Sequence, residues 1–436
     1  MTRLHAGIAA GLFVLAGTAF ADDGPGKSSK SGDKSVAPKK ADARPAPSIP
    51  KELEAKAKAL IAASESGLAA IMAKAILDGS QLGPGEGWFK VPPQKMYGWK
   101  WVADRHRIDE KAALDAEFFK GPAPLFEILD RNGDGSLAAS DFDWSPDSQF
   151  AKQMQLAAAL FRPNDRDGDG RLSKEEWNGA FARAKSESLS QESVRRLLFP
   201  NPPKLPKDEA AKSAMMAAMG GPTPEILIKG LFAGEVGSMQ EGPNVGDAAP
   251  DFTLSTADGK TTIRLKDKIG AKPVVLICGN YSCGPYRSWS ETFAELARRF
   301  ADRAVFLGIY VREAHPTDGW RMESNDRAGI SYAQPRTDAE RRKTAATCNA
   351  KLKLPFPVLV DGVDDMVGNL YSGMPGRFYV IDAGGRVTYK SARGPFGFKP
   401  QELEQNLALT LLAAEPAAAP KADAATKAKP PSTAGN

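Results

Sequence analysis

Cysteine and histidine, the residues that carry most thiol and acid–base chemistry, are scarce in this chain. There are three of each among 436 residues. An odd and low cysteine count excludes a disulfide scaffold, and outside the cytoplasm it leaves at least one thiol unpaired. Cys278, Cys283 and Cys348 all lie in the C-terminal half of the chain. Any thiol chemistry must therefore be sought there.

Long hydrophobic runs are also missing. The apolar run from Ala6 to Ala16 is too short to cross a bilayer, which takes roughly 20 residues. Small residues close the segment 1–21 in the pattern of a secretory cleavage site. We therefore expect an exported protein, periplasmic or extracellular, with no membrane span. Once this leader is removed, His106 and His315 are the remaining histidines.

A strong charge of one sign is absent as well. The formal net charge is +5, and the lysine-rich stretches fall in segments rich in proline, serine and alanine. Such segments are typical of solvated linkers, so we expect no nucleic-acid partner. A chain of this length can hold two or three domains. Its composition suggests a signal peptide (1–21), a disordered linker (22–50), a helical segment of unknown role (51–110), a segment with two acidic loops (111–185), a connector (186–243), an α/β domain (244–413) and a disordered tail (414–436).

The two acidic loops follow the EF-hand pattern, which places oxygen ligands at positions 1, 3, 5, 7 and 12 and glycine at position 6. They run from Asp130 to Asp141 and from Asp165 to Glu176. Carboxylates on alternate residues of a tight loop converge on one point, as a hard oxygen-seeking cation requires. The expected ligands are Asp130, Asn132, Asp134, Ser136 and Asp141 in the first loop, and Asp165, Asp167, Asp169, Arg171 and Glu176 in the second, with Ser136 and Arg171 contributing backbone carbonyls.

Apolar residues flank both loops, so we predict an all-α EF-hand pair that binds two calcium ions. Phe126 precedes the first loop, and Phe161 and Trp177 bracket the second. Asp141 at position 12 is one methylene shorter than the usual glutamate, so we expect weaker calcium binding in the first loop. Outside the cytoplasm calcium is plentiful, which favours a structural role, although a regulatory one stays open.

The C-terminal α/β domain reads as a thioredoxin-like fold. Residues 250–265 form two strands around a turn, and the short apolar runs 273–278 and 304–311 are buried strands. Helices are expected over 289–300, 337–352 and 400–412, with a capping box at Thr337 and Glu340. Three further strands (PVLVD, RFYVID and RVTYKSA) complete an order that resembles the thioredoxin fold and its redoxin relatives.

Cys283 lies in the loop after the strand that ends at Cys278, just ahead of a predicted helix. Backbone N–H groups and the helix dipole favour an anion there, so we expect a lowered thiol pKa. Met374-Pro375 matches the position where this fold carries a cis-proline beside the reactive cysteine, and we predict a cis bond there. The turn reads Cys-Gly-Pro-Tyr, so the second cysteine of a dithiol turn is absent and a dithiol cycle within it is excluded.

A second group of polar residues, Glu313 and His315, directly follows the strand 304–311. Residues two apart in extended chain project to the same side, so both side chains can face the Cys283 site. His315 is the natural proton donor near neutral pH, and Glu313 would orient it. The alternative is a surface histidine in a turn before a proline.

The stretches YSCGPY, YVREAHPTDGW and MPGRFYVIDAGGRVTYKSARGPFGF resemble the iodothyronine deiodinase family over roughly residues 246–410. The resemblance implies that Cys283 takes the place of the family's selenocysteine and that Glu313 and His315 belong to the active site. It also implies substrate contact by Arg393, while Pro375 is the candidate beside the cysteine. Pro335 stands where the family carries a further histidine.

Three functions remain open from the sequence. In the first, the Cys283 thiolate removes the halogen of an aromatic halide, His315 protonates the carbon, and an external thiol reduces the sulfenyl halide. In the second, Cys283 reduces a peroxide and a second thiol, with Cys348 as the candidate, resolves the sulfenic acid. Cys348 as a plain core residue is the alternative. In the third, the chain is a non-enzymatic calcium-binding protein with a vestigial redox fold.

Overall fold

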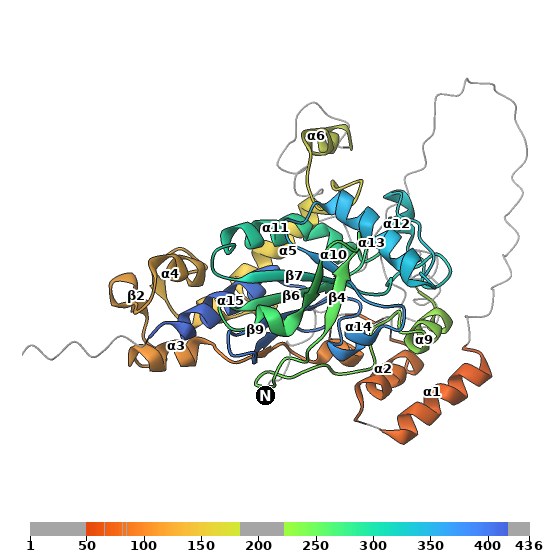
Figure 1. Cartoon of the computed structure of the whole chain (residues 1–436), viewed down its shortest axis with the longest axis horizontal. Coiled ribbons are helices and arrows are strands. Elements are labelled where there is room, and N and C mark those ends of the chain that lie inside the picture. The colour runs from red at the N-terminus through yellow and green to blue at the C-terminus, as the bar shows by residue number, and fades with distance from the viewer. Residues whose placement is uncertain (1–48, 65, 81, 84, 184–221, 417–436) are drawn as a thin grey trace, which may run out of the picture.

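The computed structural model describes residues 49–416 except 65, 81, 84 and 184–221, and the side chains of 180–183 are also left aside (Figure 1). The expected signal peptide 1–21, almost all of the linker 22–50 and most of the tail 414–436 lie outside the described residues. Within the described part, no helix is long and apolar enough to span a bilayer.

An eight-stranded mixed sheet forms the centre of the molecule, in the order β1-β10-β9-β6-β7-β8-β4-β5. The strands are β1 (Gln94–Lys95), β4 (Thr253–Thr256), β5 (Thr262–Arg264), β6 (Val274–Gly279), β7 (Val305–Tyr310), β8 (Val358–Val360), β9 (Arg377–Ile381) and β10 (Val387–Lys390). Strands β6, β7 and β8 are parallel, and β9 and β10 form an antiparallel hairpin beside β6. All six residues of β6 are buried, as the continuous apolar run predicts.

The helices of the C-terminal region follow the predicted order. They are α10 (Gly284–Ser288), α11 (Ser290–Arg299), α12 (Glu323–Arg327), α13 (Asp338–Leu352), α14 (Met366–Leu370) and α15 (Pro400–Ala414), with a 3-10 turn η4 (Leu265–Lys268). The capping box of Thr337 and Glu340 is present at the start of α13, and Met374–Pro375 is cis. Helix α15 packs on β9, β10 and α11 and is buried along most of its length.

The segment 51–110 is not one unit. Helices α1 (Lys51–Ala63) and α2 (Leu68–Leu77) pack with α9 (Pro224–Phe232), which belongs to the expected connector, and share a small apolar core with Trp88 of the 3-10 turn η1 (Gly87–Lys90). Strand β1 adds an edge to the central sheet by pairing with β10. The N-terminal half therefore contributes directly to the thioredoxin-like sheet.

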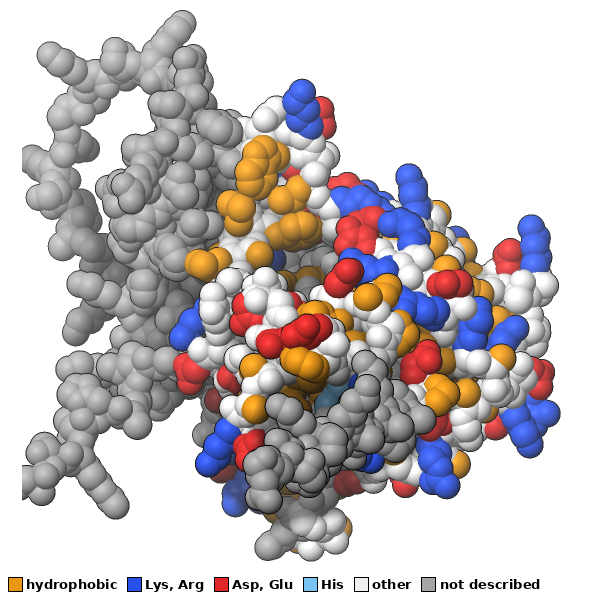
Figure 2. Space-filling view, turned by 90° about the vertical axis from the view of Figure 1, so that its left-hand side faces the viewer, with side chains coloured by type: hydrophobic (Ala, Val, Ile, Leu, Met, Phe, Trp, Pro, Cys, Tyr) orange, Lys and Arg blue, Asp and Glu red, His pale blue; other side chains and the backbone are white. Residues whose placement is uncertain are grey.

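The first acidic loop belongs to a separate cluster that packs against α15. Its elements are α3 (Trp99–His106), β2 (Leu114–Asp115), η2 (Ala116–Phe118), α4 (Ala123–Leu129), β3 (Ser136–Leu137) and η3 (Ala139–Phe142). Figure 2 looks at the molecule from this side and shows acidic, basic and hydrophobic side chains interspersed over the part that is not grey. The second loop lies further along, between α5 (Gln149–Phe161) and α6 (Lys174–Arg183).

The two acidic loops do not pair with each other. The prediction that they form one EF-hand pair is therefore wrong. Strand β3 of the first loop pairs with β2, and Leu137 at position 8 lies opposite Leu114. Counting back from Leu114 gives a twelve-residue loop, 107–118, that follows α3 as an EF-hand loop follows its helix. Its positions 1, 5 and 12 are Arg107, Lys111 and Phe118, which cannot ligate a cation.

Candidate active site and calcium loops

Cys283 occupies the N-cap of α10, as predicted, in a turn that follows β6. Hydrogen bonds from two other segments fix the position of this turn. Asn280 donates from Nδ2 to the carbonyl of Pro375 over 3.2 Å, and its Oδ1 accepts from the N–H of Ala314 over 3.2 Å. The cis-proline and the loop after β7 therefore both hold the segment that carries Cys283.

Glu313 lies beneath this turn and is fully buried. Its carboxylate accepts from the N–H of Ser282 over 2.8 Å and from the hydroxyl of Tyr310. Burial raises the pKa of this carboxyl, and the hydrogen bonds to Ser282 and Tyr310 oppose that shift. Among the described residues, no hydrogen bond joins Glu313 to the ring of His315, so Glu313 does not orient that ring by direct contact. Glu313 instead supports the residue before Cys283.

His315 reaches the same turn through its backbone. Its N–H donates to the hydroxyl of Ser282 over 3.0 Å, and its ring Nδ1 lies 3.1 Å from the carbonyl of Trp320. Because a carbonyl only accepts, the proton of the neutral ring is on Nδ1 and the lone pair is on Nε2. Desolvation lowers the pKa of His315 to about 4, with the charge of Arg287 adding to the effect. At neutral pH the imidazole is thus neutral, so His315 has to take up a proton before it can supply one.

The Cys283 thiol is buried, with only 3% of its surface exposed. Burial raises its pKa to about 11, while the N–H of Tyr286 and the charge of Arg287 act in the opposite direction. The expected lowering of this pKa is therefore wrong for the described conformation. Helix α10 has five residues, so its dipole is small, and desolvation outweighs it.

Arg287, which the sequence analysis did not single out, connects three loops around the thiol. It is 4% exposed. Its Nη1 donates to the carbonyl of Tyr281, and its Nη2 donates to Oδ1 of Asn325 over 2.8 Å. Asn325 in turn donates to the carbonyl of Ser282 over 2.8 Å. The remaining nitrogen, Nε, donates to the carbonyl of Gly168 in the second acidic loop over 3.2 Å.

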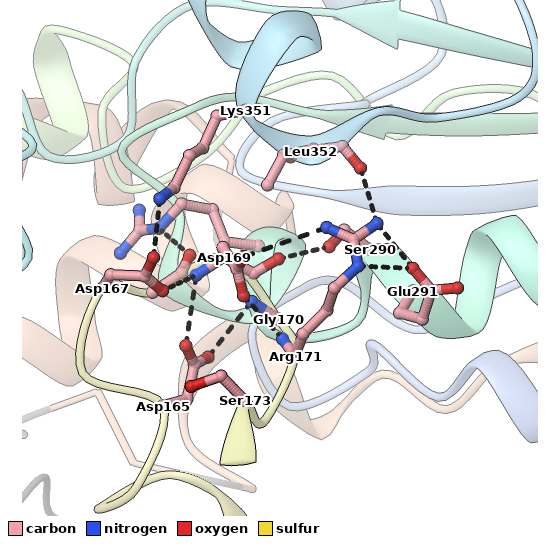
Figure 3. Close-up of polar contacts among 12 residues, drawn as sticks. Asp165, Asp167, Asp169, Gly170, Arg171, Ser173, Ser290, Glu291, Lys351 and Leu352 are labelled. Atoms are coloured by element: carbon pink, nitrogen blue, oxygen red, sulfur yellow. Dashed lines mark hydrogen bonds and ion pairs between the residues drawn. The ribbon is translucent and has the colours of Figure 1, made fainter. Parts of the chain in front are cut away.

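The second acidic loop has the donors that a calcium ion needs. Carboxylate oxygens of Asp165, Asp167 and Asp169 lie within 4.8 Å of one another (Figure 3). Burial, and after it the negative charge of the neighbouring acids, raises the pKa of Asp165 to about 6. Glu176 at position 12 accepts from the N–H of Arg166 over 2.8 Å, which fixes it across the loop. This crowding of acids is the electrostatic situation that a bound cation relieves.

The first acidic loop repeats these internal bonds. Asp141 at position 12 accepts from the N–H of Arg131 over 3.1 Å, and Asp130 accepts from the N–H groups of Gly133 and Gly135 over 2.9 Å each. The carbonyl of Asp141 accepts from Gln405 of α15 over 2.7 Å. This loop is therefore anchored to the C-terminal helix and not to the Cys283 turn.

The remaining candidates are placed as follows. Arg393 is buried, donates to the carbonyls of Ser238 and Gln240 and to the hydroxyl of Ser372, and lies 4.0 Å above the Trp88 ring. Cys278 and Cys348 are fully buried, and all three thiols are free.

The sheet order, the cis-proline beside the turn and the cysteine at a helix N-cap define a thioredoxin-like domain. Solved structures that resemble the chain include a putative thiol:disulfide interchange protein DsbE from Chlorobium tepidum (22% identity, TM-score 0.28, 38% of this chain and 98% of that one). Another is the peroxidoxin BcpB from Mycobacterium tuberculosis (22% identity, TM-score 0.28, 39% and 97%).

Comparison with sequence relatives identifies the family within the thioredoxin-like class. The family model for iodothyronine deiodinase matches residues 227–409, and an EF-hand model matches 157–181. Thyroxine 5-deiodinase of Gallus gallus is 32% identical over 178 residues, which is 40% of this chain and 67% of the relative. Type I iodothyronine deiodinase of Xenopus laevis is 28% identical over 36% of this chain and 61% of the relative. The chain belongs to the iodothyronine deiodinase family, and it spans about two thirds of the length of these relatives.

Proposed function

We propose that this protein is an exported, calcium-binding thiol oxidoreductase that removes halide reductively from aromatic halides, with Cys283 as the nucleophile. The observation that carries the proposal is the junction at Ser282. There, the carboxylate of Glu313 and the backbone N–H of His315 both bond the residue next to Cys283. The two residues that the family resemblance places in the active site thus converge on the turn that carries the third.

The reaction is balanced with one thiol on the enzyme and two external thiols. The sulfur of Cys283 bonds the halogen, the carbon–halogen bond breaks, and the carbon takes a proton, giving the reduced arene and a sulfenyl halide. One external thiol displaces the halide and forms a mixed disulfide. The second releases Cys283 and leaves as the external disulfide. The arene is reduced and the two external thiols are oxidised.

The protonation states around the turn require the proton to pass from the thiol before the sulfur can attack as a thiolate. With a pKa of about 11, the Cys283 thiol keeps its proton at neutral pH, whereas His315, with a pKa of about 4, is neutral. The free lone pair on Nε2 of His315 suits it to accept the thiol proton as the sulfur attacks. The resulting imidazolium then supplies that same proton to the carbon. His315 acts as base first and as acid second.

A cavity of about 190 Å³ supports the role of Arg393 in binding substrate. Arg377, Lys390 and Arg393 line it together, and among the described residues none of the three forms an ion pair with a carboxylate. Burial, and then the charges of Arg377 and Arg393, lower the pKa of Lys390 to about 8. One acid, Glu241, lines the cavity with these three cations, so the cavity keeps an excess of positive charge and we assign it to an anionic group of the substrate, such as a carboxylate.

Halide release tests the proposed reaction. The full-length protein is incubated with an iodinated phenol and a dithiol, and free iodide is measured for the native protein, Cys283→Ser and Cys348→Ala. We expect release by the native protein and by Cys348→Ala, and none by Cys283→Ser. Absence of iodide from the native protein across a panel of halogenated aromatics would sink the proposal.

The same panel includes hydrogen peroxide, because one observation favours a peroxidase as the second candidate. The charge of Arg287 acts on both the Cys283 and the Cys348 thiol, which favours Cys348 as the resolving thiol. Peroxide consumption that depends on Cys283 and Cys348, without halide release, would identify the protein as a peroxidase. Inertness of Cys283 in every assay would leave a calcium-binding protein without redox activity.

We further propose calcium as the ion of both acidic loops and a compartment outside the cytoplasm as the site of action. The EF-hand match to 157–181 and the convergent acids of the second loop support the first point, and the pattern of residues 1–21 supports the second. Bound calcium would offset the repulsion among the acids and order the loop backbone. Calorimetric titration of the native protein should show two sites, the weaker lost in Asp141→Asn.

A further inference from the structure

The second acidic loop is docked on the helices that follow Cys283. The hydroxyl of Ser290 at the start of α11 donates to the carbonyl of Asp169 over 2.9 Å. Arg171 donates from Nε to the carboxylate of Glu291 over 2.8 Å and from Nη2 to the carbonyl of Leu352 over 3.2 Å (Figure 3). These contacts reach α11 and the end of α13, so the loop bridges two elements of the thioredoxin-like domain.

The contact is close enough to exclude any side chain at position 6 of the loop. A Cβ on Gly170 would lie 2.1 Å from the carbonyl oxygen of Arg287 and 2.6 Å from the hydroxyl of Ser290. The glycine at position 6 of the first loop, Gly135, meets nothing within 4 Å. Both have positive φ, as the EF-hand bend requires, but only Gly170 also has to be glycine for the sake of a neighbour.

We propose that Arg287 is a positioning residue through which a divalent cation in the second acidic loop controls access to Cys283. The guanidinium bonds the carbonyl of Gly168 on one side and the carbonyl of Tyr281, two residues before the thiol, on the other. Through Asn325 it also holds the carbonyl of Ser282. One buried side chain therefore joins the loop backbone to both peptide groups that precede Cys283.

The cation acts on this connection through the loop backbone. Without it, the four acids Asp165, Asp167, Asp169 and Glu176 repel one another, and the loop gains freedom around Gly168 and Asp169. Their carbonyls are the groups that Arg287 and Ser290 bond. Loss of these bonds releases the turn that keeps Cys283 buried. With the cation bound, the turn is closed; without it, the thiol is more accessible.

The inference rests on the proposed function only in taking Cys283 as the reacting thiol, and its test needs no substrate. The full-length protein is treated with iodoacetamide at one fixed pH, with calcium or with a chelator, and each cysteine is followed by peptide mass spectrometry. Couplings between sites typically amount to 5- to 150-fold, and we expect calcium to slow alkylation of Cys283 by about tenfold. Cys278, fully buried in β6, serves as the internal control of global opening. Equal rates at Cys283 in both conditions would overturn the proposal whatever the enzyme's activity.

The Arg287→Lys variant distinguishes calcium binding itself from the effect of calcium on Cys283. The variant should still take up calcium in calorimetry, yet calcium should no longer slow the alkylation of Cys283. Arg341→Lys is the matched control, because Arg341 is as deeply buried but bonds the carbonyl of Gly362 and the carboxylate of Asp365, not the loop. Native-like calcium protection in Arg287→Lys would refute the role of Arg287.

A reciprocal measurement on the native chain covers the case in which Arg287→Lys does not fold. An adduct on Cys283 holds the turn open, and because calcium favours the closed turn, the adduct should weaken calcium binding at the second loop. Calorimetry on native protein alkylated at Cys283 should show a weaker second site and an unchanged first site. Unchanged affinity at both sites would contradict the coupling.

Discussion

The two acidic loops have the same ligand pattern but are built into different parts of the molecule. The first pairs through β3 with β2, in a loop without ligating side chains at positions 1, 5 and 12, and its end bonds Gln405 of α15. The second has no strand partner among the described residues and is bonded to Arg287 and Ser290 beside Cys283. A calcium motif thus predicts the ion and not the consequence of binding it, which depends on what the loop contacts.

Truncating the leucine at position 8 of each loop should give the largest difference in stability between the two loops. Leu137 is fully buried in the first loop, whereas Leu172 in the second is partly exposed. Truncation of a buried leucine leaves a cavity, so Leu137→Ala should lower the free energy of unfolding by about 3 kcal/mol. Leu172→Ala should cost about 1 kcal/mol or less. Urea unfolding of both variants gives the two free energies of unfolding. Equal losses of free energy in the two variants would show that the two loops are packed alike.

The pH dependence of Cys283 alkylation tests the closed turn beside the second loop. Burial raises the pKa of the thiol to about 11, so its alkylation in calcium should rise with pH until about that value. In denaturant it should level off near the ordinary thiol value of about 8.5. Because the folded pKa is the higher one, the stability contributed by the protonated thiol is complete below the unfolded pKa and is lost as pH rises toward 11. A plateau near pH 8.5 in the native protein would mean that the turn is open.

Neutralising the acid at position 12 of each loop distinguishes the effects of the two calcium ions. Glu176→Gln should abolish the roughly tenfold protection of Cys283 by calcium, because the second loop no longer holds its ion. Asp141→Asn should lose uptake at the first loop and keep that protection. Calorimetry and alkylation on the same preparations give both readouts. Loss of protection in Asp141→Asn would show that the first loop also controls the turn.

A pair of serines on adjacent helices gives the smallest effect. Ser290→Ala removes the bond to the carbonyl of Asp169, and a neutral hydrogen bond contributes about 1 kcal/mol. Calcium affinity of the second loop should fall by about fivefold. Ser288, whose hydroxyl bonds the carbonyl of Pro285 and no loop residue, is the control. Equal affinities in Ser290→Ala and Ser288→Ala would mean that docking adds nothing to binding.

Local patterns in the sequence predict much of this structure. The buried strands, the capping box at Thr337 and the position of Cys283 at a helix start each depend on residues close together in the chain, and each is confirmed. The cis bond at Pro375, which was predicted from the fold, is also confirmed. The fold class and the family follow from the same stretches.

Features that depend on distant segments were missed. The loop 107–118 has no ligand pattern, and only the match of Leu114 to Leu137 in strand pairing marks it. Docking of the second loop uses backbone carbonyls, which every residue has, so no motif records it. The raised pKa of Cys283 follows from burial by many segments, whereas the helix start that argues for a lowered pKa is visible locally.

Strand β1 has a practical consequence for anyone who wishes to produce the deiodinase-like region alone. A fragment cut at residue 227 or 244 would lose Gln94 and Lys95 and leave β10 with an unpaired edge. It would also lose Trp88, which covers the guanidinium of Arg393. Unpaired edges promote association between chains. We therefore expect such fragments to aggregate during expression, and soluble preparations should begin before α1.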